Sequence, residues 1–469
     1  MHKHLLLLIC TALCSSALYC NQTEITAQIS QHQTRIAHNP ENAEYHFAYG
    51  DYLASLDRRE YDTEAFTHLK KATELQPHTM QWLFRLGSFA CRIGLLQESL
   101  EAYMHILKKH PSLTSVLYNA GFTFKVAGEL DVAARIYAHI IAKDPEYEPA
   151  HLGLAFALVA HGKYAAGWKE HLWNLKKQKK DSPELRQFIQ DGTLAGKRIL
   201  LIPEGGLGDT LHFIRYAQRI HHMGAQVIVA VQRPLLALLS GCPYIDLLLP
   251  TGMPIEKFDA KATLMSLATF FQDTQDTIPQ NIPYIFPDPN RVAYWNKQLA
   301  DDHSFKIGIC WQPDSHNDIS RLPIARRGIP LSFFHTLATT PGVTLYSLQQ
   351  HEGLDQLNNL PQNAIIKTFD STFDVTHGSF CDTAAVMQSL DLIISTDTAT
   401  AHLAGALGKR TWLLLPFNSD WRWLAHRSDS PWYPTMRIFQ QERPFDWHTT
   451  MHTLHDVFFN EVYPSITHS

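Results

Sequence analysis

The 469-residue sequence lacks the features that mark several common functional classes. Lys and Arg (40) are slightly outnumbered by Asp and Glu (45), and no run of like charge is longer than the pairs Lys176-Lys177 and Lys179-Lys180. A nucleic-acid-binding protein normally carries a basic stripe, so no nucleic-acid partner is expected. The 27 histidines are scattered, without a His-Glu-x-x-His motif or a Cys/His cluster at zinc spacing. The sequence therefore predicts no metal site.

Cysteine is scarce, with seven residues in the whole chain. Cys10, Cys14 and Cys20 lie within the first twenty residues, and the other four are far apart in apolar surroundings. A chain of this size has no need of a disulfide framework. The four are predicted to be free thiols that pack as small core hydrophobes: Cys91, Cys242, Cys310 and Cys381.

Long apolar runs are absent as well. The run from Leu5 to Leu13 is too short to cross a bilayer, so no transmembrane span is expected. A short positive start precedes it, and Ser15-Ser16-Ala17 supplies small residues suited to a signal peptidase. Cys20 is a weaker lipoprotein candidate, because the bulky Tyr19 precedes it. Residues 1–20 thus resemble an export signal, and the alternative is an apolar leading segment of a cytosolic protein.

What the N-terminal part does contain is a repeat of 34 residues, in which Arg85-Leu86-Gly87 recurs as Asn119-Ala120-Gly121. Glycines at the expected inter-helix turns and prolines at the unit ends follow the same period: Gly94, Gly128 and Gly162, with Pro77, Pro111 and Pro145. Small residues and aromatics alternate where helices must cross: Ala65, Ala72, Ser99 and Ala133, with Tyr103 and Tyr137. One helix pair cannot bury its apolar face alone, so the pattern predicts a stack of pairs.

This pattern resembles the tetratricopeptide repeat (TPR) family over roughly residues 40 to 175. The first unit departs from the family pattern by about three extra residues around Asp57-Arg58-Arg59-Glu60. The alternative is an unrelated helical bundle with coincidental spacing. The resemblance implies a concave surface that holds peptides or partner proteins.

After Gly196 the pattern changes to alternating strands and helices, which is typical of parallel sheets with crossover helices. The predicted strands are 199–202, 226–231, 245–249, 306–311, 343–348, 364–367, 392–395 and 411–415, with a helix at 211–220. Two doubly wound units joined near Asp288 imply a cleft, with ligands at the carboxyl ends of strands.

A glycine-rich turn, Glu204-Gly205-Gly206-Leu207-Gly208-Asp209-Thr210, follows the first of these strands. Dinucleotide binding is disfavoured, because Leu211 replaces the third glycine and the next strand ends at Gln232 rather than an acidic residue. A P-loop is excluded, since no Gly-Lys-Ser/Thr follows. The alternative is a turn that needs glycine for steric reasons alone, but this does not explain why Asp209 heads the helix at the cleft.

A second cluster runs from Ser395 to Gly408, where an apolar strand ends and a helix of small residues begins. Asp397 or Thr398 is predicted to cap this helix, whose free N–H groups could then bind a phosphate. His402 lies one turn inside, on a face near Thr398. The alternative is an ordinary capped helix with a polar histidine at a lobe boundary.

Both clusters resemble the heptosyltransferase-like glycosyltransferases, and more closely bacterial proteins that fuse TPR repeats to that domain. The matching motifs are Gly-Leu-Gly-Asp-Thr-Leu-His, Asp-Thr-x-x-x-His-Leu-Ala-Gly-Ala-Leu-Gly, and the stretches Leu414 to Leu424 and Asp429 to Pro434. The resemblance spans roughly residues 160 to 460. It implies the GT-B fold, an α/β architecture of two Rossmann-like lobes, no metal or cofactor, and a nucleotide sugar held mainly by the C-terminal lobe.

The resemblance also implies roles for individual residues. Asp209 matches the general base, and Gly206 and Gly208 belong to the donor-binding turn. Asp397, Thr398 and His402 match the segment that contacts the nucleotide diphosphate. Arg327 would neutralise the leaving diphosphate, unless Arg326-Arg327 is simply a solvated pair. Trp421 and Trp423 are expected to pack the lobe.

One departure concerns the turn after Trp311, where relatives carry a glycine and this chain has Gln312-Pro313-Asp314-Ser315-His316. Proline cannot donate an N–H and limits close backbone approach. Two functions follow. The first is a metal-independent transferase that moves a hexose- or heptose-type sugar from a nucleotide sugar to a protein or glycan acceptor selected by the repeats. The second is a TPR scaffold whose GT-B domain has lost catalysis, which Pro313 favours.

The expected organisation has five parts: a signal-like segment at 1–20, TPR repeats at 24–175, a linker at 176–196, an N-terminal GT-B lobe at 197–287 and a C-terminal lobe at 288–469. The location stays open, because nucleotide sugars are cytoplasmic whereas residues 1–20 suggest export.

Overall fold

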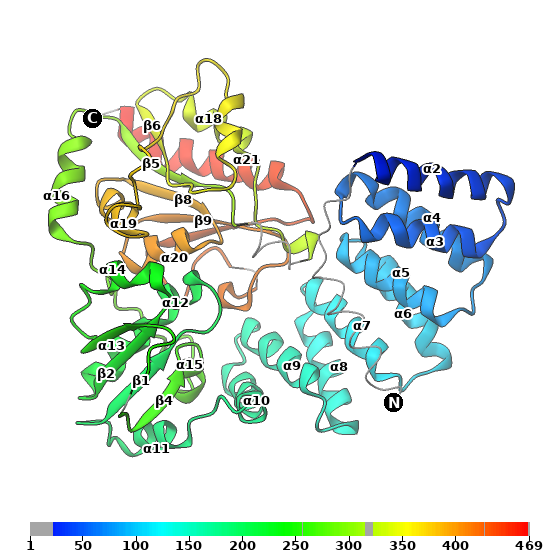
Figure 1. Ribbon diagram of the computed structural model, residues 1–469, viewed down its shortest axis with the longest axis horizontal. Helices are drawn as coiled ribbons and strands as arrows, with labels where there is room; N and C mark the ends of the chain where they lie inside the picture. Colours follow the sequence, from blue (N-terminus) through cyan, green and yellow to red (C-terminus); the bar gives the residue numbers. More distant parts are fainter. Residues whose placement is uncertain (1–21, 256, 315–321, 426, 468–469) are drawn as a thin grey trace. The chain divides into compact units, whose positions relative to one another are not determined.

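The computed structural model describes residues 22–467, except residues 256, 315–321 and 426 (Figure 1). The signal-like segment, with Cys10, Cys14 and Cys20, lies outside the described residues. By packing, the chain divides into a first unit that ends at Ala127 but also includes residues 322–324, and a second unit that contains the other described residues from Gly128 onward. Each unit is considered by itself.

The first unit consists of helices, as the 34-residue period predicts. Its elements are α2 (Gln22–His38), α3 (Ala43–Ser55), η1 (Arg59–Tyr61), α4 (Asp62–Leu75), α5 (Met80–Arg92), α6 (Leu96–Lys109) and α7 (Thr114–Val126). The short helix η1 begins within the extra residues of the first repeat, at Arg59. Between α5 and α6, Gly94 turns the chain with φ +86°. A Cβ on Gly87 would lie 2.8 Å from the Tyr103 ring, so glycine and tyrosine are complementary there.

The second unit begins with three more repeat helices, α8 (Leu130–Lys143), α9 (Glu148–Ala160) and α10 (Tyr164–Lys177). Gly128 and Gly162 have φ of +82° and +77° at the turns. Tyr137 packs on Gly153 as Tyr103 packs on Gly87. The TPR-like helical region predicted from the sequence is therefore confirmed.

The last repeat helices share a hydrophobic core with the following α/β region. Trp168 and Leu175 of α10 are buried in that core together with Leu185 of α11 (Pro183–Asp191). The Trp168 Nε1 donates a hydrogen bond to the carbonyl of Asp273 at 2.5 Å. The segment between α10 and the first strand is therefore packed structure rather than an extended connection.

The first sheet has four parallel strands in the order β3-β2-β1-β4. These are β1 (Arg198–Ile202), β2 (Gln226–Val231), β3 (Leu247–Pro250) and β4 (Ala260–Thr263), with η2 (Arg233–Leu235) and the helices α12 (Leu207–Phe213), α13 (Arg215–His222), α14 (Leu236–Leu239) and α15 (Ser266–Phe270). Strand β4 was not predicted, because Ala-Lys-Ala-Thr lacks an apolar run. The helix predicted over 211–220 is two helices that break at Ile214.

The second sheet has six parallel strands in the order β10-β9-β8-β5-β6-β7. They are β5 (Phe305–Cys310), β6 (Val343–Ser347), β7 (Ile366–Lys367), β8 (Leu392–Thr396), β9 (Thr411–Leu415) and β10 (Met436–Gln440). Around them lie α16 (Pro289–Gln298), α18 (His335–Ala338), α19 (Cys381–Gln388), α20 (Ala399–Ala406), α21 (Trp447–Val457) and α22 (Tyr463–Thr467), with η4 (Leu331–Phe334), η5 (Leu354–Asn359), η6 (Trp421–Trp423) and η7 (Phe458–Val462). The short helix η3 (Pro323–Ala325) begins in the residues that group with the first unit. Strand β10 was also missed, since its polar ends hide a short apolar centre. Two parallel-sheet lobes confirm the predicted α/β fold class.

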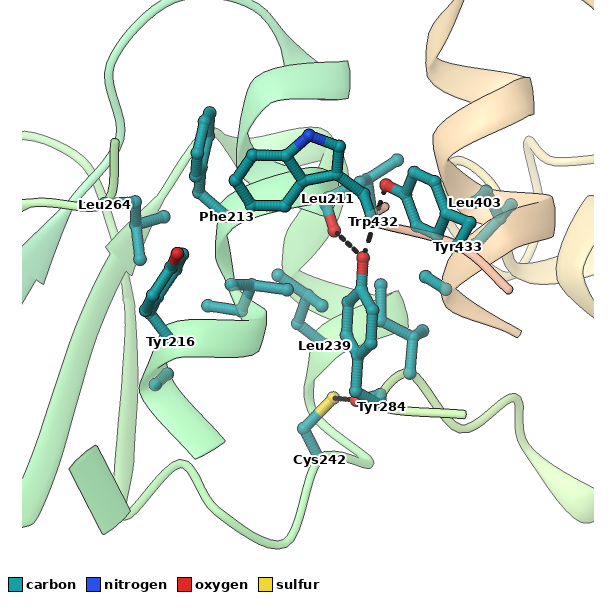
Figure 2. Packing of buried hydrophobic residues seen from close by; sticks show 14 of the residues in the cluster. Leu211, Phe213, Tyr216, Leu239, Cys242, Leu264, Tyr284, Leu403, Trp432 and Tyr433 are labelled. Carbon is teal, nitrogen blue, oxygen red and sulfur yellow. Dashed lines mark hydrogen bonds between the residues drawn. The ribbon is translucent and has the colours of Figure 1, made fainter. Parts of the chain in front are cut away.

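Aromatic residues join the two lobes in one core. Figure 2 shows Phe213 beside Trp432, with Tyr284 reaching Tyr433. Of the predicted free thiols, Cys91, Cys242 and Cys310 are buried and Cys381 is half-buried. Within the part of the chain that the structure describes, no helix is long and apolar enough to cross a membrane.

Candidate functional site

The glycine-rich turn after β1 folds the Asp209 carboxylate back onto the start of α12. Gly206 is the N-cap residue, and its N–H donates to Asp209 Oδ2 at 2.7 Å. Gly205 has φ +81°, and a Cβ there would overlap the Asp209 carboxylate. The turn therefore requires a glycine at position 205 so that the Asp209 carboxylate can reach back to the N–H of the N-cap residue Gly206.

Gly208 brings α12 into contact with α20. A Cβ on Gly208 would lie 3.0 Å from His402 Cδ2 and 3.4 Å from Ala399 Cα. The first turns of the two helices are therefore in van der Waals contact. The fold thus joins the two motifs that the sequence analysis singled out, although they are far apart in the chain.

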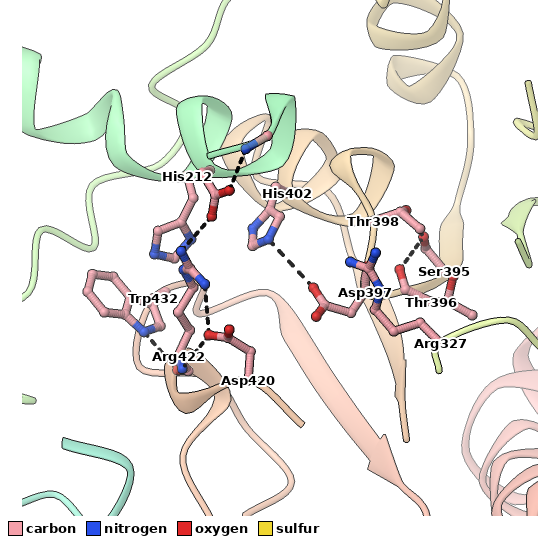
Figure 3. Close-up of polar contacts among 12 residues, drawn as sticks. His212, Arg327, Ser395, Thr396, Asp397, Thr398, His402, Asp420, Arg422 and Trp432 are labelled. Atoms are coloured by element: carbon pink, nitrogen blue, oxygen red, sulfur yellow. Dashed lines mark hydrogen bonds and ion pairs between the residues drawn. The ribbon is translucent and has the colours of Figure 1, made fainter. Parts of the chain in front are cut away.

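The Asp209 carboxylate forms an ion pair that the sequence analysis missed. Arg422 Nη2 lies 2.5 Å from Asp209 Oδ1, and Arg422 Nη1 lies 2.7 Å from Asp420 Oδ1. Burial alone would lower the pKa of Arg422, but Asp420 and Asp209 hold it above its usual value. One buried guanidinium thus compensates two carboxylates (Figure 3). No spacing in the sequence indicated the pair with Asp209, because Arg422 lies 213 residues further along the chain.

The residues at the end of β8 lie together with Arg327. Arg327 Nη1 donates to the carbonyl of Asp397 at 2.6 Å. Thr398 is the N-cap residue of α20, but its side chain makes no capping bond and its Oγ1 lies 3.1 Å from Ser395 Oγ. Of the two predicted cap residues, Thr398 is therefore the one at the N-cap position, although its side chain leaves the helix N–H groups unbonded. The helix begins with N–H groups that its own N-cap side chain does not engage.

His402 is buried between the two motifs. Its Nε2 lies 3.7 Å from Asp397 Oδ1, and its Nδ1 lies 3.0 Å from the Tyr433 hydroxyl. Burial lowers the pKa of His402 to about 4, with Asp397 opposing the shift and Arg422 adding to it. His402 is therefore neutral at physiological pH. Its ring stacks on Trp423 with centroids 5.3 Å apart, which gives that tryptophan the expected packing role.

Trp421 packs against the last repeat pair. Its ring is stacked on Phe156 of α9 with centroids 5.4 Å apart. It also makes an edge contact with Trp168 of α10. The helix η6 therefore links these repeat helices to Arg422 and, through it, to Asp209.

The backbone N–H groups of the turn after β5 donate to a side chain that follows β6. Gln349 Oε1 accepts from the N–H groups of Trp311 and Gln312 at 3.1 and 3.0 Å. Gln349 Nε2 donates to the carbonyl of Gln312 at 2.8 Å. Pro313, which follows, has no N–H. The N–H groups of Trp311 and Gln312 are therefore already hydrogen-bonded to the Gln349 side chain. Ser315 and His316 lie outside the described residues.

The chain was compared with family models, with curated proteins and with solved structures. No family model matches the chain. Protein FlbA of Caulobacter vibrioides is 26% identical over 458 residues, which are 92% of this chain and 75% of FlbA.

Solved structures with a similar fold include a MamA fragment from Desulfovibrio magneticus RS-1, at 17% identity over 34% of this chain and 88% of that one, with a TM-score of 0.30. Heptosyltransferase II of E. coli matches 56% of this chain and 99% of its own at 14% identity, with a TM-score of 0.37. At these identities the likeness concerns the fold.

Proposed function

We propose that this protein transfers a sugar from a nucleotide-sugar donor to a protein or glycan acceptor that the repeats select, without a metal ion. The observation that carries the proposal is the contact between the start of α12, which bears Asp209, and the start of α20, which bears Asp397 and Thr398. A base and an anion-binding helix end would then face the same bound donor.

The donor diphosphate would bind at the start of α20. The side chain of Thr398 makes no capping bond, so the helix N–H groups and the helix dipole are suited to an anion. Arg327 is held at the carbonyl of Asp397, directly beside this helix end. Its guanidinium would stabilise the charge that develops on the leaving diphosphate.

Asp209 would act as the general base. Each carboxylate oxygen accepts one hydrogen bond in this structure, from Arg422 or from the Gly206 N–H, and each has a further lone pair. The acceptor hydroxyl would give its proton to Asp209 while its oxygen attacks the anomeric carbon. The bond between that carbon and the diphosphate oxygen then breaks, and the nucleoside diphosphate leaves with the bonding electron pair.

The alternative is a scaffold whose GT-B domain no longer catalyses transfer. It is favoured by Pro313 and by the commitment of the Trp311 and Gln312 N–H groups to Gln349. A diphosphate could then use only the start of α20. The two functions differ in whether a bound donor is turned over.

Calorimetry with UDP, GDP and ADP tests the donor site, with Thr398→Tyr as the blocking variant. We expect one nucleotide to bind the wild type and to lose affinity for the variant. Absence of binding by all three would refute the transferase. Nucleotide binding without sugar release from any matching nucleotide sugar and acceptor preparation would favour the scaffold.

A further inference from the structure

We propose that Tyr433 is a positioning residue that fixes His402 as the neutral tautomer with its proton on Nε2, so that this N–H points toward Asp397. The consequence for ligand binding rests on the proposed function. The tautomer assignment itself rests only on the hydrogen bonds of the resting protein.

Tyr433 lies in the Asp429 to Pro434 motif, for which the proposed reaction gives no role. It is fully buried, and its hydroxyl lies 3.0 Å from the Nδ1 atoms of both His402 and His212. Its ring packs on the backbone of α20 at Gly405, where a Cβ would overlap it. Gly405, the glycine of the His-Leu-Ala-Gly segment, thus leaves the space that the Tyr433 ring occupies.

The Tyr433 hydroxyl has a single proton to share between the two imidazoles. Tyr284 does not compete for that proton. It receives a hydrogen bond from Arg215 Nη2 at 2.9 Å and donates to the carbonyl of Leu211 at 2.9 Å. Its distance to the Tyr433 hydroxyl is the longer 3.4 Å (Figure 2). Tyr433 therefore donates to one histidine and accepts from the other.

The surroundings of the two Nε2 atoms decide which histidine donates. His402 Nε2 lies 3.7 Å from Asp397 Oδ1 (Figure 3), so an unprotonated nitrogen would place its lone pair against a carboxylate. The proton therefore belongs on His402 Nε2. The Nδ1 of His402 must then accept from Tyr433, and the Nδ1 of His212 must donate to it.

His212 supplies an independent check. Its Nε2 is buried and has no hydrogen-bond partner among the described residues. With the proton on Nδ1, this atom is an unpaired acceptor, which is less costly to bury than an unpaired N–H. The reverse assignment would bury an unpaired N–H of His212 and set a lone pair of His402 against Asp397.

The charges around the pair keep both rings neutral. Burial lowers the pKa of His212 well below its usual value, and Arg215, His402 and Arg422 lower it further. For His402, burial, Arg422 and Arg215 lower the pKa, whereas Asp397 and Asp209 raise it. His402 is then a permanent hydrogen-bond donor at the start of α20, where a diphosphate would present oxygen acceptors.

The experiment uses full-length protein labelled with ¹⁵N-histidine and long-range proton–nitrogen correlation without any nucleotide. Signals are assigned with His402→Gln and His212→Gln. We expect opposite tautomers, with the proton on Nε2 in His402 and on Nδ1 in His212. We also expect an exchange-protected Tyr433 hydroxyl proton with contacts to the His402 ring. Tyr433→Phe should convert His402 to a mixture of tautomers.

Tyr216→Phe is the matched control, because it also removes a buried hydroxyl with a hydrogen bond, to Asp273, but does not touch either histidine. It should leave both tautomers unchanged. A wild-type His402 that is protonated on Nδ1 or cationic at pH 7 would overturn the proposal. So would a Tyr433→Phe spectrum with His402 unchanged. If that variant fails to fold, the wild-type spectrum provides the test. A Tyr433 hydroxyl proton that shows no contact with the His402 ring would then refute the proposal.

The nucleotide that binds the wild type should bind Tyr433→Phe roughly 3- to 10-fold more weakly, the usual effect of one hydrogen bond. If no nucleotide binds the wild type, the proposed function fails, while the tautomer assignment still stands or falls by the spectra. If a nucleotide binds but the spectra show other tautomers than those proposed for His402 and His212, only the tautomer assignment fails.

Discussion

Two strand-to-helix junctions lie side by side in this protein, and they differ in how the start of the helix is occupied. At α12, Asp209 folds back to accept the N–H of Gly206 and is neutralised by Arg422. At α20, the Thr398 side chain makes no capping bond, and Arg327 holds the carbonyl of Asp397 instead. The first junction carries its own anion, whereas the second is suited to receive one from a ligand.

The comparison predicts that the two junctions serve different partners, with proton transfer at α12 and donor binding at α20. Variants at each junction should therefore affect different measured quantities. The largest expected effect is on transfer.

Asp209→Asn should lower sugar transfer by roughly 10²–10⁴-fold, the usual contribution of a general base. Nucleotide affinity should barely change, because the proposed diphosphate contacts are Arg327 and the start of α20. The ion pair makes stability more sensitive than a capping role alone would suggest. In Asp209→Asn the buried Arg422 loses one of its two carboxylate partners and retains Asp420. The free energy of unfolding, measured in urea, should therefore fall by about 1–2 kcal/mol. Full transfer by the folded variant would show that Asp209 only caps the helix.

The pH dependence of stability tests the neutral state of His402. Its pKa falls from 6.5 in the unfolded chain to about 4 in the folded protein. Between these values the unfolded state binds more protons, so the stabilising contribution is full above pH 6.5 and is lost as the pH falls toward 4. Across that window, wild type should lose up to about 3 kcal/mol more than His402→Gln in urea titrations. Equal losses would contradict a neutral buried His402.

Arg327→Gln should weaken nucleotide binding about 10- to 100-fold in calorimetry, since hydrogen bonds to charged groups are the stronger ones. Arg326→Gln is the matched control, because it removes the same charge from the neighbouring residue. Similar losses of nucleotide affinity in both variants would indicate a general effect of positive charge. They would contradict a specific role of Arg327 in donor binding at the start of α20.

Gly208→Ala tests the contact that joins them. The added Cβ would lie 3.0 Å from His402 Cδ2, so α12 must move away from α20, at a cost of about 1–3 kcal/mol. Gly206→Ala should cost less, because its Cβ would meet only the Asp209 carboxylate, at 3.7 Å. Thermal unfolding of both variants provides the measurement. Equal shifts in Tm would mean that the helix crossing tolerates a methyl group.

The sequence by itself determined the repeat architecture, because a helix pair and its tight turn are specified within 34 residues by local glycines and small residues such as Gly94 and Ala65. It also determined the strands with continuous apolar runs, and the two motifs that resemble a glycosyltransferase. Strands β4 and β10 escaped prediction, since short strands with polar residues are stabilised by sheet pairing rather than by local pattern.

Only the tertiary structure decided which residues around those motifs act together. Arg422 compensates Asp209 from 213 positions away, and Tyr433 reaches His212 from a separation of 221. Ion pairs and shared protons depend on distances of a few ångströms between distant segments, and sequence spacing does not encode them. Local sequence specified the helices that carry the candidate site, and packing between the lobes set the charge and hydrogen bonds of its side chains.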